Sequence, residues 1–158
     1  MTEEKPKRVA LIASQGTLDG AYPPLIIATT AVAMDMEVAI FFTFYGLNII
    51  HKKKMHTLKV SPVGNPAMPM PIPSIVSIIP GMTPMATGMM KSWMSKAGTA
   101  SIPDLVEACV EFGVRMIACQ MTLDVLGIKR EELIDECEVG GAATFLEYAA
   151  EADISLFM

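Results

Sequence analysis

Three short apolar runs, each followed by turn-forming residues and a helical pattern, constrain the fold of this chain more than any other feature. They cover residues 8–13, 37–43 and 114–119. Short, continuous apolar runs are typical of strands that are covered on both faces of a parallel sheet. A segment rich in Ala, Ile and Leu, residues 21–34, separates the first two runs and predicts a helix. The opening of the chain is therefore predicted to be a βαβ unit with a parallel strand pair.

The second half of the chain continues this alternation. Ser101 is the predicted N-cap of a helix that Gly113 closes, with an apolar stripe at Leu105, Ala108, Cys109 and Phe112. Beyond the third strand, the pattern predicts two short helices, a strand start or turn, a helix and a terminal strand at residues 120–127, 129–134, 138–139, 140–152 and 153–157. The alternation predicts an open α/β fold with a mainly parallel sheet, in one domain over residues 1–158.

A stretch rich in proline and methionine interrupts this pattern. Residues 60–90 contain no charged residue, seven of the 11 prolines and six of the 14 methionines. Each internal proline costs a helix about 3 kcal/mol, so no uninterrupted helix and no membrane span of about 20 residues is expected here. We interpret residues 60–100 as an apolar insertion that covers the core or a neighbouring subunit, or forms a lid over a reactive site. Membrane contact without a span stays open as an alternative.

The overall composition excludes some classes of partner. The net charge of −5 and the pI of about 5.0 argue against nucleic acid, because the chain lacks the basic surface that binds phosphates. An apolar content of 52% and a mean hydropathy of +0.44 instead predict a buried subunit interface or a membrane contact. The polar start of the chain lacks a secretory signal pattern, so the expected location is the cytoplasm.

Cys119 is the strongest candidate for a reactive residue. It ends the third predicted strand, and ligands of open parallel sheets bind at the carboxyl ends of the strands. A helix predicted to be capped by Thr122 follows, and the positive end of its dipole favours a thiolate over a thiol. Asp124 opposes this effect if its carboxylate faces the sulfur. From the residues alone, Cys119 is either a reactive thiol or a buried strand-end cysteine.

The other two cysteines favour structural roles. Cys109 lies on the apolar stripe of its helix and is predicted to be a small buried side chain. Cys137 lies among carboxylates that disfavour a thiolate. The cysteine spacing matches neither a disulfide framework nor a zinc site, so no metal is expected. The two histidines, His51 and His56, lie in a basic polar segment and give little support to a Cys–His catalytic pair.

The first strand ends in small and polar residues that could bind an anion. Ser14, Gly16, Thr17 and Asp19 would offer hydroxyls and exposed amides before a helix, which suits a phosphate or sulfonate group. No GxGxxG or Walker pattern is present. The alternative is a plain strand–helix turn that is capped by Thr17 or Asp19.

The ends of the second and third strands supply the remaining candidate binding residues. After the second strand these are Thr43, Tyr45 and Gly46, and after Cys119 they are Gln120 and Met121. The aromatic residues at the end of the second strand either wall a pocket or pack against the core.

Four segments of the chain resemble the DsrE/DsrF/DrsH-like sulfur-relay family, and its subgroup labelled peroxiredoxin-like. They are residues 16–19, 40–47, 118–128 and 139–145, which occur in order over nearly the whole chain. The resemblance implies a flavodoxin-like fold with helices on both faces of the sheet, assembly into homo-trimers or homo-hexamers, and sulfane sulfur carried as a persulfide on Cys119. No motif Pro-x-x-x-Thr-x-x-Cys surrounds any cysteine, so the peroxiredoxin label carries no peroxidase prediction.

These observations lead to one main functional hypothesis and two alternatives. The main one is a sulfur carrier or sulfurtransferase that holds a persulfide or thiosulfonate on Cys119 and exchanges it with donor and acceptor proteins, without a cofactor. No base or second cysteine is predicted beside Cys119, which favours a relay protein over a self-sufficient enzyme. The alternatives are a non-catalytic nucleotide- or flavin-binding module and a peripheral membrane or scaffold protein that uses residues 60–90.

Overall fold

A parallel sheet forms the centre of the computed structural model, which describes residues 5–61 and 78–158. Within these ranges the strands are β1 (Arg8–Ala13), β2 (Glu37–Phe42), β3 (Arg115–Cys119), β4 (Glu138–Gly140) and β5 (Ile154–Phe157). Their order across the sheet is β4-β3-β2-β1-β5, and every pair is parallel. The helices are α1 (Leu18–Ala33), α2 (Met82–Lys96), α3 (Ile102–Glu111), α4 (Gln120–Leu126) and α5 (Ala142–Ala149), with short 3₁₀ turns η1 (Phe44–Ile49), η2 (Lys54–His56) and η4 (Arg130–Glu132).

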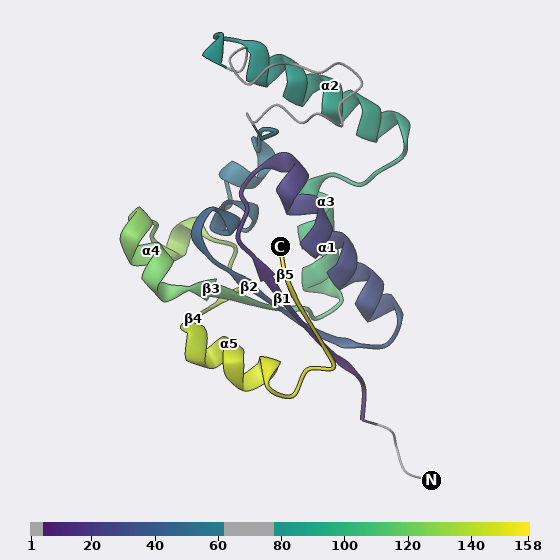
Figure 1. The fold of residues 1–158 in the computed structure, drawn as a ribbon, viewed down its shortest axis with the longest axis vertical. Coiled ribbons are helices and arrows are strands. Elements are labelled where there is room, and N and C mark those ends of the chain that lie inside the picture. The colour runs from purple at the N-terminus through teal and green to yellow at the C-terminus, as the bar shows by residue number, and fades with distance from the viewer. Residues whose placement is uncertain (1–4, 62–77) are drawn as a thin grey trace.

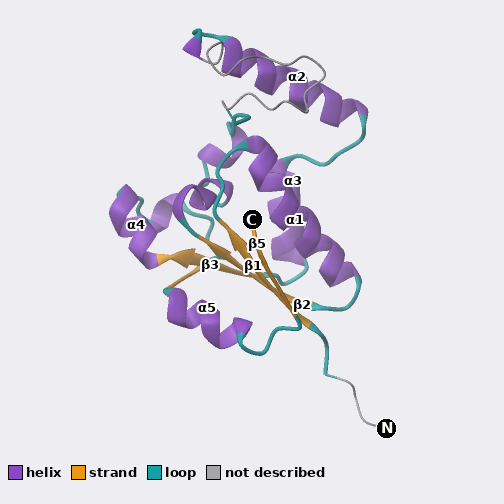
Figure 2. Ribbon diagram, viewed as in Figure 1, coloured by secondary structure: helices purple, strands orange, loops and turns teal. Residues whose placement is uncertain are grey.

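Helices cover both faces of this sheet (Figure 2). The chain adds β2, β3 and β4 on one side of β1 and then returns to place β5 on the other side. In right-handed crossovers, the direction in which the chain moves across the sheet decides which face the connecting helix covers. The α1 and α3 helices therefore share one face, and α5, on the return to β5, lies on the other (Figure 1). The α4 helix follows directly from the carboxyl end of β3. The open, doubly wound α/β architecture predicted from the sequence is confirmed.

The two faces carry separate hydrophobic clusters. Along β3, Met116 and Ala118 belong to the large cluster beneath α1 and α3, whereas Ile117 and Cys119 belong to the smaller cluster beneath α5. This division follows from the period of two in a strand, which turns successive side chains to opposite faces. The sulfur of Cys119 is therefore on the face that α5 covers.

Most predicted elements lie within a few residues of their expected positions. The β1 strand has the predicted bounds, and α1 begins at Leu18 rather than at residue 21, because the Thr17 hydroxyl accepts a hydrogen bond from Gly20 N and caps the helix. Ser101 caps α3 as predicted and forms a capping box with Asp104. The apolar stripe of α3 is shifted, however: Phe112 is exposed because the helix ends at Glu111, and other residues of α3, notably Ile102 and Val106, are buried with Cys109.

The α2 helix was not predicted, since residues 60–100 were interpreted as an insertion in which regular structure resumes at Ser101. Pro84 lies in the first turn of α2, where its missing N–H has no helical acceptor, so this proline does not prevent the helix. The last twelve residues of α2 contain no further proline. Residues 62–77 of the predicted insertion lie outside the described residues. The predicted lid falls largely on these residues. No helix in the described ranges has the length and apolar character needed to cross a membrane.

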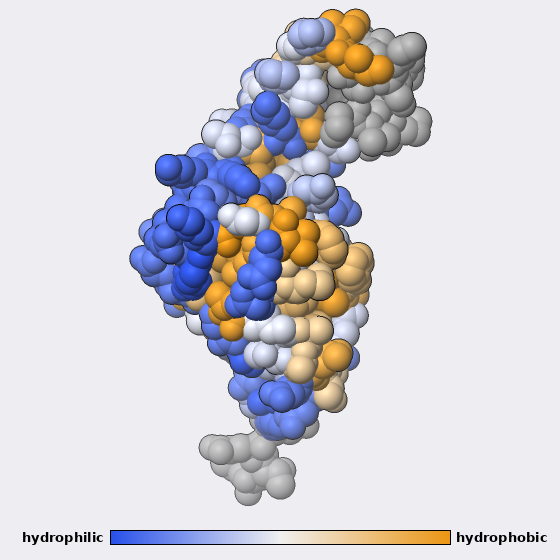
Figure 3. Space-filling model, turned by 90° about the vertical axis from the view of Figure 1, so that its left-hand side faces the viewer, coloured by the Kyte–Doolittle hydropathy of each residue, from blue (hydrophilic) through white to orange (hydrophobic). Residues whose placement is uncertain are grey.

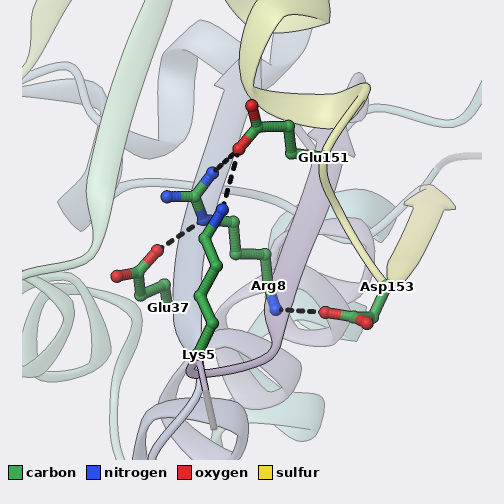
Figure 4. A network of polar contacts seen from close by, with 5 residues as sticks. All are labelled: Lys5, Arg8, Glu37, Glu151 and Asp153. Atoms are coloured by element: carbon green, nitrogen blue, oxygen red, sulfur yellow. Dashed lines mark hydrogen bonds and ion pairs between the residues drawn. The ribbon is translucent and has the colours of Figure 1, made fainter. Parts of the chain in front are cut away.

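A charged network joins the chain ends at the amino edge of the sheet (Figure 4). The Arg8 guanidinium binds the Glu37 carboxylate at 2.6 Å and the Glu151 carboxylate, which also binds Lys5 at 3.1 Å. The Arg8 amide donates to Asp153 at 2.8 Å. Exposed ion pairs contribute little individually, but this network ties β1 to β2, to the end of α5 and to the start of β5. The opposite, carboxyl edge of the sheet holds the candidate site.

Candidate functional site

Two loops, after β1 and β2, meet the start of α4, after β3, at the carboxyl edge of the sheet. The two loops are joined by backbone hydrogen bonds from Thr43 N to Ala13 O at 3.0 Å and from Gly46 N to Ser14 O at 3.2 Å. The sequence placed Ser14, Thr43 and Gly46 at this edge from strand ends alone, and the structure brings these residues together.

Two glycines allow this close approach. A Cβ atom on Gly16 would lie 2.2 Å from the Tyr45 carbonyl oxygen, and one on Gly46 would lie 2.0 Å from the Ala13 carbonyl oxygen. Both contacts involve backbone, so no side-chain movement relieves them. The two loops interlock through these glycines.

Thr122 joins α4 to the loop after β2. Its fully buried hydroxyl oxygen lies 3.1 Å from Phe44 N, from which it accepts a hydrogen bond, and 3.2 Å from the Thr43 hydroxyl. Phe44 has a φ of +46°, a left-handed conformation that is unfavourable for a residue with a bulky side chain. Thr122 was predicted as the N-cap of α4, and this is wrong: Cys119 occupies the N-cap position, without a side-chain capping hydrogen bond. The Thr122 hydroxyl instead holds the strained start of η1.

Cys119 ends β3, between the ends of β2 and β4, and is 6% exposed. Its cluster contains Ala10, Phe41, Ile117 and Phe145, and the rings of Phe41 and Phe145 stack with centroids 5.2 Å apart. Within the described residues no side chain forms a hydrogen bond with its sulfur. The thiol therefore sits in an apolar setting at a strand end.

The other two cysteines belong to the large cluster on the opposite face of the sheet. Cys109 is fully buried, and burial raises the pKa of its thiol to about 11. The Cys137 thiol donates to the Ile134 carbonyl at 3.2 Å, and burial again raises its pKa, with a smaller upward effect from Glu136. All three cysteines are free thiols. The sheet therefore separates Cys119 from Cys109 and Cys137, which lie in the core as small buried side chains.

Asp124 is engaged with its own helix. Gln120 Nε2 donates to Asp124 Oδ1 at 2.9 Å on the exposed side of α4. Met121, the residue after Gln120, is exposed. Of the residues that follow Cys119, Gln120 therefore positions the carboxylate, and Met121 presents its thioether to the surroundings. No cluster of three or more metal-ligating His, Cys, Asp or Glu side chains exists among the described residues.

The polar residues after β1 each have a partner within the fold. The Ser14 hydroxyl donates to the Met158 carbonyl at 2.9 Å, and Asp19 Oδ1 accepts from Ser61 N at 3.0 Å. Thr17 caps α1, which is the structural alternative considered from the sequence. These contacts hold the first loop against the chain end and against the segment that leads out of η2.

Apolar side chains surround the edge. Phe44 is 48% and Tyr45 63% exposed, and on α4 Met121 and Val125 are also exposed. Figure 3 shows the face of the molecule on which α4 lies, where a hydrophobic area is bordered by hydrophilic side chains. We call these four residues the apolar rim. The sequence predicted the aromatic pair at this edge, whereas the anchoring role of Thr122 and the cover by Phe145 gave no local signal, since both depend on tertiary contacts.

The chain is similar to one known protein family over nearly its whole length. The model of the DsrE/DsrF/DrsH-like family matches residues 5–157. The chain is 49% identical to a protein of Allochromatium vinosum named "Sulfur carrier protein DsrE2", over 96% of this chain and 98% of that protein. It is also 34% identical over the full length of both chains to the uncharacterized protein YrkE of Bacillus subtilis.

Two solved structures share the fold at low sequence identity. The YchN protein of E. coli matches with a TM-score of 0.62 and 13% identity, over 96% of this chain and 99% of that chain. The protein of unknown function MTH1491 of Methanobacterium thermoautotrophicum matches with a TM-score of 0.57, the same identity of 13% and the same coverage of 96% and 99%. At this identity the structures establish the architecture alone. The family match over residues 5–157 and the 49% identity to a named sulfur carrier lead to one conclusion: the chain belongs to the DsrE/DsrF/DrsH-like family.

Proposed function

We propose that this protein is a sulfur carrier that holds sulfane sulfur as a persulfide on Cys119 and relays it between a donor and an acceptor protein. The observation that carries the proposal is the position of Cys119, the cysteine at a strand end, separated by the sheet from the two core cysteines. The 49% identity to a protein named as a sulfur carrier supports the same role.

The transfer chemistry balances without an oxidant or a cofactor. The Cys119 thiolate attacks the outer sulfur of a donor persulfide, so an Sγ–S bond forms while the donor S–S bond breaks and the donor leaves as a thiolate. In the second half-reaction an acceptor thiolate attacks the outer sulfur on Cys119, and Cys119 leaves as a thiolate. Each step moves one sulfur atom, and the electron pair of the broken bond stays with the leaving thiolate.

The setting of Cys119 suits storage better than independent catalysis. The apolar cluster beneath α5 limits access of water and oxidants to Cys119, a residue that is 6% exposed. No described side chain is hydrogen-bonded to this sulfur, so a base that would generate the thiolate must come from the partner or from solvent. The protein then exchanges sulfur when a partner engages the edge, and whether this amounts to catalytic turnover depends on that partner.

The apolar rim is the proposed contact surface for these exchanges. Its exposed aromatic and aliphatic side chains lie beside the strand end that carries Cys119. The remaining candidate binding residues shape the edge beside this rim through contacts within the fold; they are Ser14, Gly16, Thr17, Asp19, Thr43, Gly46 and Gln120. Exposed apolar surface of this kind also supports assembly into homo-trimers or homo-hexamers. Three free thiols suit a reducing compartment, so we place the protein in the cytoplasm.

A nucleotide- or flavin-binding module is the competing hypothesis from the sequence. Such a module would need open backbone amides at the carboxyl edge, as in phosphate-binding turns. At this edge the Ser14, Thr43 and Gly46 amides already donate to the Met158, Ala13 and Ser14 carbonyls. These occupied amides give the alternative no support.

A transfer assay tests the proposal. The protein is incubated with a small-molecule persulfide, freed of excess donor and mixed with an acceptor thiol, and the sulfur that reaches the acceptor is quantified. We expect Cys119→Ser to abolish the transfer and Cys137→Ser, the matched control on the other face of the sheet, to retain it. Transfer by Cys119→Ser at the wild-type level would refute the proposal.

A further inference from the structure

The α1 helix carries almost no charge, although it lies on the outside of the sheet (Figure 1). It covers β1 and β2, and the sequence has no charged residue at positions 20–34. The α3 helix, on the same face, instead exposes Asp104, Glu107 and Glu111. A surface helix normally presents charged residues on its outer side, whereas a helix that is apolar all round is normally buried. The composition of α1 therefore indicates a helix that is covered on both sides in the assembled protein.

The outer side of α1 forms a regular stripe. The residues that face the core recur at a spacing of three and four, and they are Leu18, Ala21, Leu25 and Ala28. Exposed residues recur at the same spacing on the other side, and we call them the α1 stripe: Pro23, Ile26, Thr30 and Ala33. Ile26, in the middle of the stripe, is 45% exposed. Beside it, the Thr29 hydroxyl donates to carbonyls of its own helix at 2.9 and 3.1 Å, so this hydroxyl needs no outside partner.

The exposed apolar surface continues on the edge strand β5. Within the described residues β5 pairs with β1 and ends the sheet. Ile154 and Leu156 lie opposite Val9 and Leu11, so their side chains point to the face that α1 covers, and each is 41% exposed. Edge strands are normally protected from pairing by charged residues or proline, and residues 154–157 include neither.

We propose that a second copy of this chain covers the α1 stripe and the β5 edge, in a two-fold contact that packs α1 of one protomer against α1 of its partner. Interfaces between identical chains are more apolar than other protein interfaces, and charged residues are depleted at their centre. A two-fold axis lets one apolar stripe pack on itself, without charge repulsion in a chain with a net charge of −5.

The lack of charge on α1 argues against two other occupants. Helices that lie on a membrane surface carry Lys or Arg on their polar face, and α1 has neither residue. A partner with a charged surface would lose the hydration of its charges against a stripe that offers no counter-charge.

The contact specifies the assembly proposed above, and it rests on that assembly rather than on the chemistry of Cys119. A two-fold contact needs an even number of copies, so it fits the homo-hexamer and not the homo-trimer. When such a contact is lost, the assembly separates into two equal halves.

Sedimentation velocity of the full chain tests this contact through the mass of the assembly. Ile26→Glu places a charge in the middle of the α1 stripe, and we expect it to halve the mass. Leu146→Glu is the matched control, because it places the same charge on an exposed aliphatic residue of α5, on the opposite face of the sheet. This variant should keep the wild-type mass. Far-UV circular dichroism will show that both variants are folded.

Mixing two variants distinguishes a second copy from a different partner. Ile26→Glu and Ile26→Lys should each halve the mass alone, and an equimolar mixture should recover the wild-type mass, because opposite charges then meet across the contact. A mixture that stays at half the mass would overturn the two-fold contact.

Three further outcomes would overturn the proposal. The first is a wild-type mass for Ile26→Glu, and the second is an equal loss of mass in Ile26→Glu and Leu146→Glu. The third is a wild-type chain that is monomeric at micromolar concentration; co-sedimentation of this monomer with phosphatidylcholine vesicles would assign the stripe to a lipid surface instead. The transfer assay on Cys119 has a separate readout, so a failure of sulfur transfer with an unchanged mass would contradict the proposed sulfur chemistry alone.

Discussion

Removing the hydroxyl of Thr122 tests how the site is held together. Thr122→Val keeps the shape of the side chain and replaces the hydroxyl with a methyl group. The Phe44 amide then loses the acceptor that lies 3.1 Å away, and the Thr43 hydroxyl loses a partner at 3.2 Å. Because Thr122 is fully buried, no water replaces the missing oxygen without movement of the loops.

The expected loss of stability follows from these two contacts. A buried backbone N–H without a partner costs about 1–3 kcal/mol, whereas the Thr43 hydroxyl can rotate toward solvent and contributes about 1 kcal/mol or less. Phe44, which has a φ of +46°, then loses a hydrogen bond that stabilises its left-handed conformation. We expect Thr122→Val to lower the free energy of unfolding by about 2–3 kcal/mol.

Urea denaturation and amide hydrogen exchange measure this effect together. The control is Thr122→Ser, which keeps the acceptor and loses one methyl group, worth about 1 kcal/mol. The Phe44 amide should exchange faster in Thr122→Val and stay protected in Thr122→Ser. If Thr122→Val unfolds within about 0.5 kcal/mol of wild type and the Phe44 amide stays protected, the proposed anchoring of η1 is wrong.

Three further predictions concern the packing, the pH dependence and the buried thiols. Gly46→Ala should destabilise the fold by about 3 kcal/mol in urea denaturation, since its Cβ would meet backbone, whereas Gly88→Ala at an open helical position should stabilise it by up to about 1 kcal/mol; equal effects would contradict the interlocked loops. Burial, followed by the charge of a nearby lysine, lowers the pKa of His51. The contribution of His51 to stability is therefore present above about pH 6.5 and is lost as the pH falls. His51→Gln should make the urea midpoint decline less steeply on the acid side, and an unchanged pH profile would contradict this prediction. Iodoacetamide at about pH 8 should leave Cys109 and Cys137 unmodified in the folded protein and label both in urea, as peptide mass spectrometry would detect, because burial raises both pKa values; rapid labelling in the folded state would contradict their burial.

The positions of the strands along the chain could be predicted from local patterns. Continuous apolar runs mark β1, β2 and β3 within one residue of their ends, because parallel strands are buried on both faces. Helix caps at Thr17 and Ser101 could also be predicted, because a cap depends on residues only three positions apart in the sequence. The position of Cys119 at the carboxyl edge then followed from the topology of parallel sheets.

The parts that escaped prediction depend on contacts between distant residues. Prolines made the segment before residue 101 look irregular, although Pro84 falls where α2 tolerates it. The pairing of Gly16 with the Tyr45 carbonyl, and of Gly46 with the Ala13 carbonyl, has no sequence pattern, because glycines mark turns in general. Thr122 resembled a helix cap, and its role as an anchor for the second loop became visible only with the fold.

Cys119 links these observations to function, and its covalent state is the most direct measure of the account. The variant Cys109→Ser/Cys137→Ser leaves Cys119 as the one remaining cysteine and is incubated with a small-molecule persulfide donor. Peptide mass spectrometry then follows the fragment that contains Cys119. We expect a gain of the mass of one sulfur atom on this fragment, reversed by an acceptor thiol. An unmodified Cys119 under conditions that load the donor onto free cysteine would contradict the central claim.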